Sequence, residues 1–249
     1  MTWNSSAKAA GLLASLGLFG LLAASARAEE APQYQIERCC EICPQALQDS
    51  AYSGDMGEFA KLVQGREDWL FRSKIDLMTD IGTTAEGYQH LQRLRDALKE
   101  RGVELVMVYL PPRGLVSPEM LSAQSRSGYD AELSRKNYLG TIERLRSLGI
   151  RVPDMAQLLD QPAAVRETLF FKRDNHWTPR GAELTAQLLA AELGKSEVFK
   201  GIPRKDFVTK VDGLHYEPGR LNLAFGKICG YGYANQFFTR YMTEPKDES

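Results

Sequence analysis

A nearly continuous apolar run at residues 103–110 is the feature that most constrains the fold of this chain. A run of this kind, without regular alternation of polar residues, is typical of a strand buried on both faces of a parallel sheet. Gly102 separates it from a helical pattern at residues 83–98, where apolar side chains recur at three- and four-residue steps. The spacing of Thr83 and Glu86 fits a capping box, so we expect this helix to begin at Thr83.

The middle of the chain continues the alternation of strand and helix. We expect a helix at residues 130–148, followed by a short strand at residues 150–152. A second short strand at residues 169–171 leads to a helix at residues 178–193, which starts with a threonine cap and a proline and which Gly194 ends. This order predicts an α/β fold with a parallel sheet flanked by helices.

The flanking regions carry weaker patterns. Residues 55–63 show a short helical pattern, and residues 68–71 read as a buried strand because they hold two aromatic residues and a leucine. Residues 213–232 are rich in glycine, and we expect loops there. Residues 233–241 contain aromatic side chains without a clear period.

The first 28 residues resemble a signal for export. Lys8 supplies a positive charge, residues 9–24 form an apolar run, and Ala26 and Ala28 fit a cleavage site. A membrane anchor is the alternative, but the apolar run is short for a membrane span. We therefore expect removal of residues 1–28 and export of the mature chain. The formal net charge of −1 gives no basic footprint for nucleic acid.

Four cysteines are compatible with a disulfide after export: Cys39, Cys40, Cys43 and Cys229. We expect a Cys43–Cys229 bridge, although Cys39 or Cys40 could pair with Cys229 instead. Cys40 and Cys43 also have the Cys-x-x-Cys spacing of a redox or metal pair. The three histidines lie far apart in the sequence, so we predict no metal site, and nothing indicates a cofactor.

Asp174 and His176 are the candidate catalytic residues. They lie two residues apart on a loop between the strand at residues 169–171 and the helix that Thr178 caps. A catalytic histidine needs a partner that fixes its tautomer and stabilises the imidazolium, and a carboxylate does both. The alternative is that both side chains only cap the helix and form local hydrogen bonds.

A nucleophile is harder to find. Serines cluster at residues 117–127 without the strand-to-helix turn that exposes a nucleophile, and Ser196 and Ser249 have no glycine on either side. None of the cysteines lies in a convincing reactive context. Arg113 follows the strand at residues 103–110, where loops gather around sites in α/β sheets, so it is a candidate for binding a substrate carboxylate. A solvated loop arginine is the alternative.

Four blocks of the sequence resemble the AlgX/AlgJ family of periplasmic polysaccharide O-acetyltransferases, namely residues 66–72, 79–87, 109–116 and 174–181. The last block is the most specific of them: Asp174-Asn175-His176-Trp177-Thr178-Pro179-Arg180-Gly181. The resemblance covers essentially the whole chain after the signal. It implies an SGNH hydrolase-like fold in which aspartate and histidine precede the nucleophilic serine.

The resemblance also implies roles and partners. Asp174 would orient His176, and His176 would be the general base for a serine that carries the acetyl group. The implied reaction is O-acetylation of alginate or polymannuronate hydroxyls, with an acetyl-donor protein and other subunits of the alginate secretion complex as partners. The family's paired cysteines correspond to Cys43 and Cys229.

One departure from the family matters for activity. Its nucleophilic serine and a carbohydrate-binding domain would lie beyond Ser249. We therefore expect residues 29–249 to form a catalytic domain that is incomplete at its C-terminus and nearly inert alone. A non-catalytic polymer-binding or scaffold subunit of the export machinery is the competing hypothesis. A free-standing esterase that uses a serine from residues 117–127 is the third.

Overall fold

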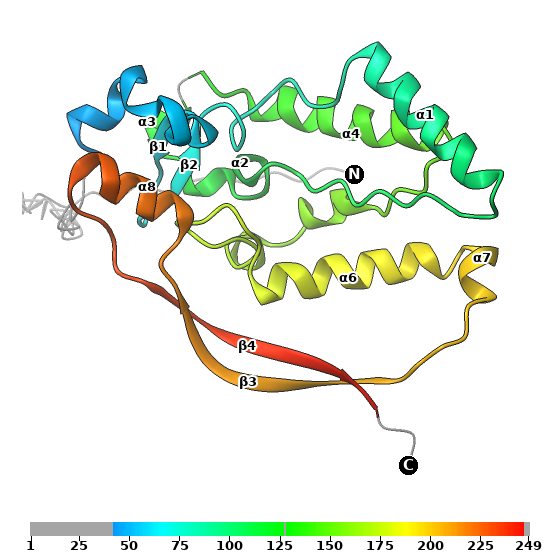
Figure 1. Ribbon diagram of the computed structural model, residues 1–249. Coiled ribbons are helices and arrows are strands. Elements are labelled where there is room, and N and C mark those ends of the chain that lie inside the picture. The colour runs from blue at the N-terminus through cyan, green and yellow to red at the C-terminus, as the bar shows by residue number, and fades with distance from the viewer. Residues whose placement is uncertain (1–41, 127, 247–249) are drawn as a thin grey trace, which may run out of the picture. The chain divides into compact units, whose positions relative to one another are not determined.

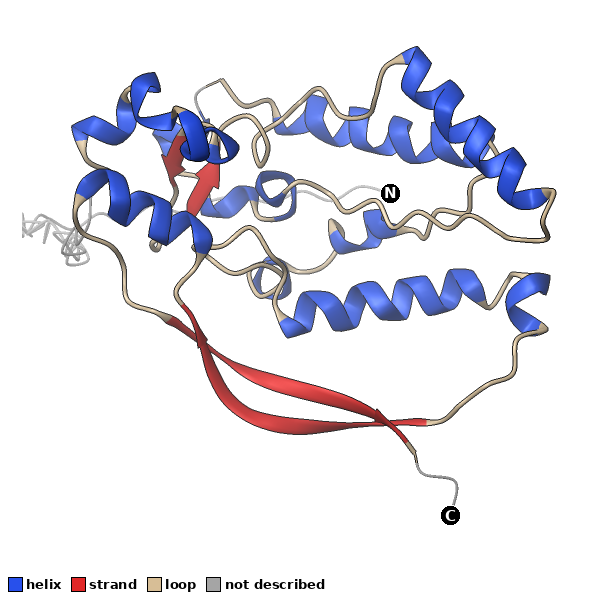
Figure 2. Cartoon of the chain, in the orientation of Figure 1, coloured by secondary structure: helices blue, strands red, loops and turns tan. Residues whose placement is uncertain are grey.

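The computed structural model describes residues 42–126 and 128–246, which all belong to one compact unit (Figure 1). The predicted signal peptide at residues 1–28 lies outside the described residues, as do Cys39 and Cys40. Helices and strands both occur, as an α/β fold requires (Figure 2).

The apolar run at residues 103–110 is joined to the segment around Arg151 by a parallel bridge at Val106. The amide of Met107 donates to the carbonyl of Arg151 at 2.9 Å, and the amide of Arg151 donates to the carbonyl of Leu105 at 3.1 Å. The parallel direction is as predicted. The prediction that residues 103–110 are buried on both faces is wrong. Among the described residues, this segment has one hydrogen-bonded strand neighbour, and most of its side chains are partly exposed.

Three long helices form as predicted from the sequence: α1 (Ala85–Lys99), α4 (Ala131–Ser147) and α6 (Pro179–Leu193). Each begins with a side-chain cap, from Thr84, Asp130 and Thr178 respectively. The cap of α1 is one residue later than expected, because the Thr84 hydroxyl, and not that of Thr83, accepts from the amide of Gly87. The core side of α4 and the strand segments enclose the main apolar cluster, which includes Trp69, Tyr138 and Met155.

A two-stranded antiparallel sheet lies near the N-terminal end of the described chain, with β1 (Leu62–Gln64) paired to β2 (Leu70–Arg72). The helical pattern expected at residues 55–63 is only partly correct, since the 3₁₀ helix η3 (Gly54–Phe59) ends before the strand begins. The aromatic strand predicted at residues 68–71 is confirmed as buried, because Trp69 and Phe71 have no exposed surface.

The expectation of loops at residues 213–232 is wrong. Strand β3 (Phe207–Glu217) leads into helix α8 (Arg220–Cys229), and β4 (Gln236–Pro245) returns antiparallel to β3. The strands were missed because most of their residues are exposed, so neither face imposes an apolar alternation. The buried face of α8 carries Leu221 and Phe225 into a second, smaller apolar cluster.

The predicted Cys43–Cys229 disulfide is present, with Cα atoms 5.6 Å apart. It joins the last residue of α8 to the start of the described chain, just before the 3₁₀ helix η1 (Pro44–Leu47). The other short helices lie between the long elements, namely η2 (Asp49–Tyr52), α2 (Arg113–Val116), η4 (Pro118–Met120), α3 (Ala123–Arg126), η5 (Met155–Leu158), α5 (Ala163–Arg166) and α7 (Glu197–Lys200). Among the described residues, no helix combines the length and apolar character needed to cross a membrane.

Candidate active site

The loop before α6 folds back on itself as a tight hairpin. Phe170 and Trp177 form an antiparallel bridge, and the amide of Phe171 donates to the carbonyl of His176 at 3.2 Å. The cap residue Thr178 closes the base of the loop, since its amide donates to the carbonyl of Leu169 at 2.9 Å. Residues 172–176 therefore form the tip of a loop that is fixed at both ends.

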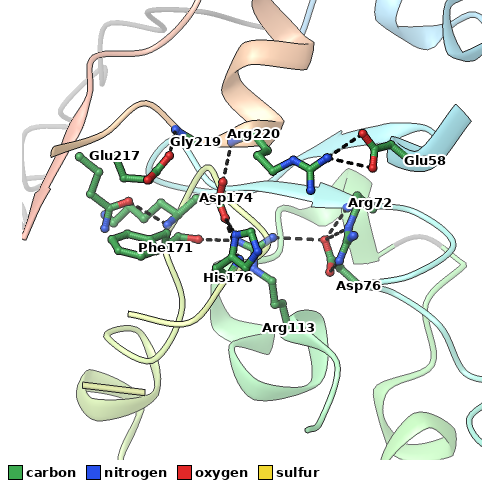
Figure 3. A network of polar contacts seen from close by, with 12 residues as sticks. Glu58, Arg72, Asp76, Arg113, Phe171, Asp174, His176, Glu217, Gly219 and Arg220 are labelled. Atoms are coloured by element: carbon green, nitrogen blue, oxygen red, sulfur yellow. Dashed lines mark hydrogen bonds and ion pairs between the residues drawn. The ribbon is translucent and has the colours of Figure 1, made fainter. Parts of the chain in front are cut away.

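Asp174 and His176 contact each other at this tip (Figure 3). Oδ1 of Asp174 lies 2.5 Å from Nδ1 of His176 and also accepts from the amide of His176 at 2.8 Å. The carboxylate is buried, whereas the His176 side chain is 62% exposed. No polar contact engages Nε2 of His176 within the described part of the chain, so this nitrogen is open to an incoming group.

The second carboxylate oxygen of Asp174 is held by α8. The backbone amide of Arg220, the first residue of that helix, donates to Oδ2 at 2.6 Å. Burial acts to raise the pKa of Asp174, but the hydrogen bonds from Arg220 and from His176 outweigh it and lower that pKa. The carboxylate therefore stays ionised and opposite the imidazole.

The contact from α8 was not predicted from the sequence. The segment containing Arg220 read as a glycine-rich loop, and a backbone amide leaves no signature in residue type. The Pro218-Gly219 turn before α8 is the signal that could have indicated a helix start.

Arg113 lies close to the candidate pair in the fold but is buried. Its Nη1 donates to the carbonyl of Leu70 at 2.9 Å and to Asp76 at 3.2 Å, and its Nη2 donates to the carbonyl of Phe171 at 2.7 Å. The guanidinium is 2% exposed and lies over the ring of Trp69. These contacts join β2 to the strand that enters the loop, so they favour a structural role over the expected binding of a substrate carboxylate.

Two basic residues just before Asp174 pair with the turn between β1 and β2. Lys172 lies 3.1 Å from Glu67, and Arg173 lies 3.5 Å from Asp68. The two acidic residues have φ angles of 50° and 64°, which non-glycine residues seldom adopt. The pairs connect this turn to the loop that carries the candidate site.

The described serines among the candidate nucleophiles lie in other contacts, whereas residues 127 and 249 lie outside the described part of the chain. Ser117 is buried and donates to the carbonyl of Arg166. Ser122 and Ser125 bond to each other, and Ser196 donates to Glu104. Within residues 42–126 and 128–246, none of these hydroxyls bonds to His176, and no group of three or more His, Cys, Asp or Glu side chains is arranged to hold a metal ion.

Comparison with known proteins assigns the chain to a family. Residues 62–249 match the family described as SGNH hydrolase-like domain, acetyltransferase AlgX. The chain belongs to this family. Membership confirms the resemblance expected from the sequence blocks and the SGNH hydrolase-like α/β fold.

Individual AlgX relatives agree with the family match. The alginate biosynthesis protein AlgX of Pseudomonas aeruginosa is 45% identical over 216 residues, which cover 86% of this chain and 45% of AlgX. A solved structure of P. aeruginosa AlgX is similar with a TM-score of 0.75 at 44% identity, covering 82% of this chain and 50% of that one. The chain thus spans about half the length of the AlgX proteins it matches.

A more distant structure widens the comparison. The O-acetyltransferase domain of Pseudomonas putida AlgJ is similar with a TM-score of 0.57 at 26% identity, covering 75% of this chain and 66% of that one. The AlgX-type fold therefore extends to a protein described as an O-acetyltransferase.

Proposed function

We propose that Asp174 and His176 are the aspartate and histidine of a Ser-His-Asp O-acetyltransferase that acts on alginate or polymannuronate hydroxyls in the periplasm. One observation carries the proposal: a buried, ionised Asp174 holds Nδ1 of an exposed His176 at 2.5 Å and leaves Nε2 open. This is the geometry that a general base requires. Membership of the AlgX family supports the acyl-transfer class and the role in alginate biosynthesis.

The proposed reaction has two steps. A serine hydroxyl attacks the carbonyl carbon of the acetyl donor while Nε2 of His176 takes its proton, and the leaving group departs with that proton. A sugar hydroxyl then attacks the acetyl-serine, His176 takes the proton of this hydroxyl, and the proton returns to the serine oxygen. Asp174 keeps the imidazole oriented and stabilises its charged form in both steps.

We propose that the serine comes from outside this chain. No described hydroxyl bonds to His176, and removal of a triad member typically lowers the rate on the order of 10⁴-fold. The chain supplies the base and its orienting carboxylate, and alone it should be close to inactive. An acetyl-donor protein and other subunits of the alginate secretion complex are the proposed partners.

Two experiments test the proposal. Coding DNA beyond codon 249 should encode a Gly-x-Ser block, and the extended protein should transfer acetyl groups to deacetylated polymannuronate. The same protein with His176→Ala should lose this activity. The purified chain of 249 residues should hydrolyse a chromogenic acetyl ester no faster than its own His176→Ala variant. Turnover that Ser117→Ala abolishes would instead identify a free-standing esterase.

The competing proposal is a polymer-binding or scaffold subunit without catalysis. The absence of a described hydroxyl at Nε2 of His176 favours it. Alginate binding that persists in a His176→Ala variant, together with an extended protein that transfers no acetyl groups, would decide for the scaffold.

A further inference from the structure

We propose that the backbone amide of Arg220 is a positioning group for Asp174, and that Gly219 is the residue that allows this amide to reach the carboxylate. The inference rests on the proposed function, since it names the group that fixes the orientation of Asp174 and, through it, of His176. It concerns a main-chain group at the start of α8, more than forty residues after Asp174 in the sequence.

Two hydrogen bonds fasten the start of α8 to the loop. The amide of Arg220 donates to Oδ2 of Asp174 at 2.6 Å, and the amide of Asn222 donates to the carbonyl of Arg173 at 3.2 Å. Figure 3 shows the carboxylate between the Arg220 amide on one side and the His176 ring on the other. Both oxygens of Asp174 are therefore engaged, so the carboxylate cannot rotate without breaking a bond to a charged acceptor.

Gly219 makes this approach possible for two reasons. Its φ of 83° lies in the region that favours glycine. A Cβ atom at this position would lie 2.2 Å from the carbonyl oxygen of Arg173 and 2.8 Å from its carbon, which is closer than real Cβ atoms come. Any other residue would therefore push α8 away from the loop and lengthen the bond from Arg220 to Asp174.

The hydrogen bond from Arg220 to Asp174 affects which tautomer of His176 predominates. With Oδ2 fixed by Arg220, Oδ1 accepts from Nδ1–H and favours the neutral form that carries its proton on Nδ1. That form leaves the lone pair of Nε2 free to accept a proton, on a side chain that is 62% exposed. The positioning group thus acts through Asp174 on the atom that would accept the proton.

The side chain of Arg220 can be separated from its amide. The guanidinium bonds both carboxylate oxygens of Glu58, at 2.8 and 3.0 Å, and does not contact the candidate pair. Arg220→Ala therefore removes the pair with Glu58 and keeps the amide. Arg220→Pro removes both, and proline suits the first residue of a helix because that amide has no partner within the helix.

The measurement is the tautomer of His176 in the full chain, from ¹⁵N chemical shifts recorded at increasing pH until they no longer change and the imidazole is neutral. The chain has three histidines, so single substitutions assign the signals. We expect Nδ1–H to predominate in the wild type and in Arg220→Ala. In Arg220→Pro the ratio of Nδ1–H to Nε2–H should fall about tenfold, a change equivalent to about 1.4 kcal/mol. An unchanged ratio in folded Arg220→Pro, or an equal fall in Arg220→Ala, overturns the proposal.

A second pair of variants covers the case in which Arg220→Pro does not fold. Gly219→Ala and Gly230→Ala both place alanine at a positive φ, at the two ends of the same helix. A Cβ at Gly230 meets nothing within 4 Å, whereas one at Gly219 meets Arg173. Only Gly219→Ala should lower the tautomer ratio, and equal effects of the two variants overturn the proposal.

The tautomer ratio is measured without any catalytic turnover. The proposal for the Arg220 amide and the proposal of an acetyltransferase can therefore be refuted independently of each other. A tautomer that responds as expected in a protein that never transfers acetyl groups would leave the positioning group in place and refute the acetyltransferase. Acetyl transfer by the extended protein with an unresponsive tautomer would do the reverse.

Discussion

Loss of the Cys43–Cys229 disulfide should cost a large part of the stability of this protein. The bridge joins residues separated by 186 positions in the sequence. In the chain-entropy model, closing a loop of that length lowers the entropy of the unfolded chain enough to stabilise the fold by about 5 kcal/mol, as an upper value. Folded domains typically have unfolding free energies of about 5–15 kcal/mol, so the reduced protein should be marginally stable.

The position of the bridge adds a local effect. Cys229 ends α8, and the buried face of this helix carries Leu221 and Phe225 into the second apolar cluster. Without the bridge, the end of the helix loses its covalent link to the start of the described chain, and the helix is held by this packing and by the contacts of its first turn. We therefore expect α8 to open before the main cluster around Trp69.

Equilibrium unfolding in urea tests the magnitude. The comparison is between the wild type and Cys43→Ala/Cys229→Ala, with Cys39→Ala/Cys40→Ala as the matched control. Unfolding is followed by tryptophan fluorescence in a Trp177→Phe background, in which the fully buried Trp69 reports on the main cluster. We expect a loss of about 3–5 kcal/mol in the double variant. Its m-value should rise, because an unbridged chain exposes more surface on unfolding. A loss below about 1 kcal/mol, or an equal loss in the control, would refute the loop-closure reasoning.

Three further outcomes follow from the buried polar groups and the helix cap. Folding lowers the pKa of Asp174, so the ionised carboxylate stabilises the fold above the ordinary aspartate pKa of about 3.9. This stability is lost as the pH falls through the lower pKa of the folded protein. The urea midpoint of the wild type should therefore drop more steeply on acidification than that of Asp174→Asn. Arg113→Leu removes one of the two arginines that pair with Asp76 and the side-chain donor to the carbonyls of Leu70, Phe171 and Lys172, so it should destabilise the fold by about 3 kcal/mol in thermal or urea unfolding. Arg101→Leu on the surface should change the stability by less than about 0.5 kcal/mol. Thr178→Ala removes the cap of α6 and should cost about 1 kcal/mol, and an unchanged midpoint would show that the hydroxyl is replaced by water.

The elements predicted most accurately from the sequence are those in which the capping residues and the pattern of apolar side chains indicate the same structure. Helix α6 has a threonine cap, a proline in its first turn and a glycine stop, and its observed bounds match the prediction. The loop before it could be recognised as a candidate site because Asp174 and His176 have chemistry that residue type reveals. The bridge between Cys43 and Cys229 was also accessible, since cysteines are few and their positions at the two ends of the chain limit the choices.

The missed features depend on groups without a residue signature. Helix α8 begins after a glycine whose role is a close approach to Arg173, and nothing in the sequence shows which segment it approaches. The Arg220 amide that holds Asp174 is a main-chain group and carries no identity of its own. The burial of Arg113 could not be predicted from the sequence either, because β2 and the site loop, which supply the carbonyls that it bonds, are distant from it in the sequence.

The hairpin of β3 and β4 bears on how the protein behaves at high concentration. Large apolar side chains such as Val211, Leu214 and Phe237 are more than 60% exposed on this ribbon. An exposed strand edge next to uncovered apolar groups offers hydrogen bonds and contact area to another molecule at the same time. Self-association should therefore begin at this ribbon, and charged substitutions there are the first choice for keeping the protein in solution.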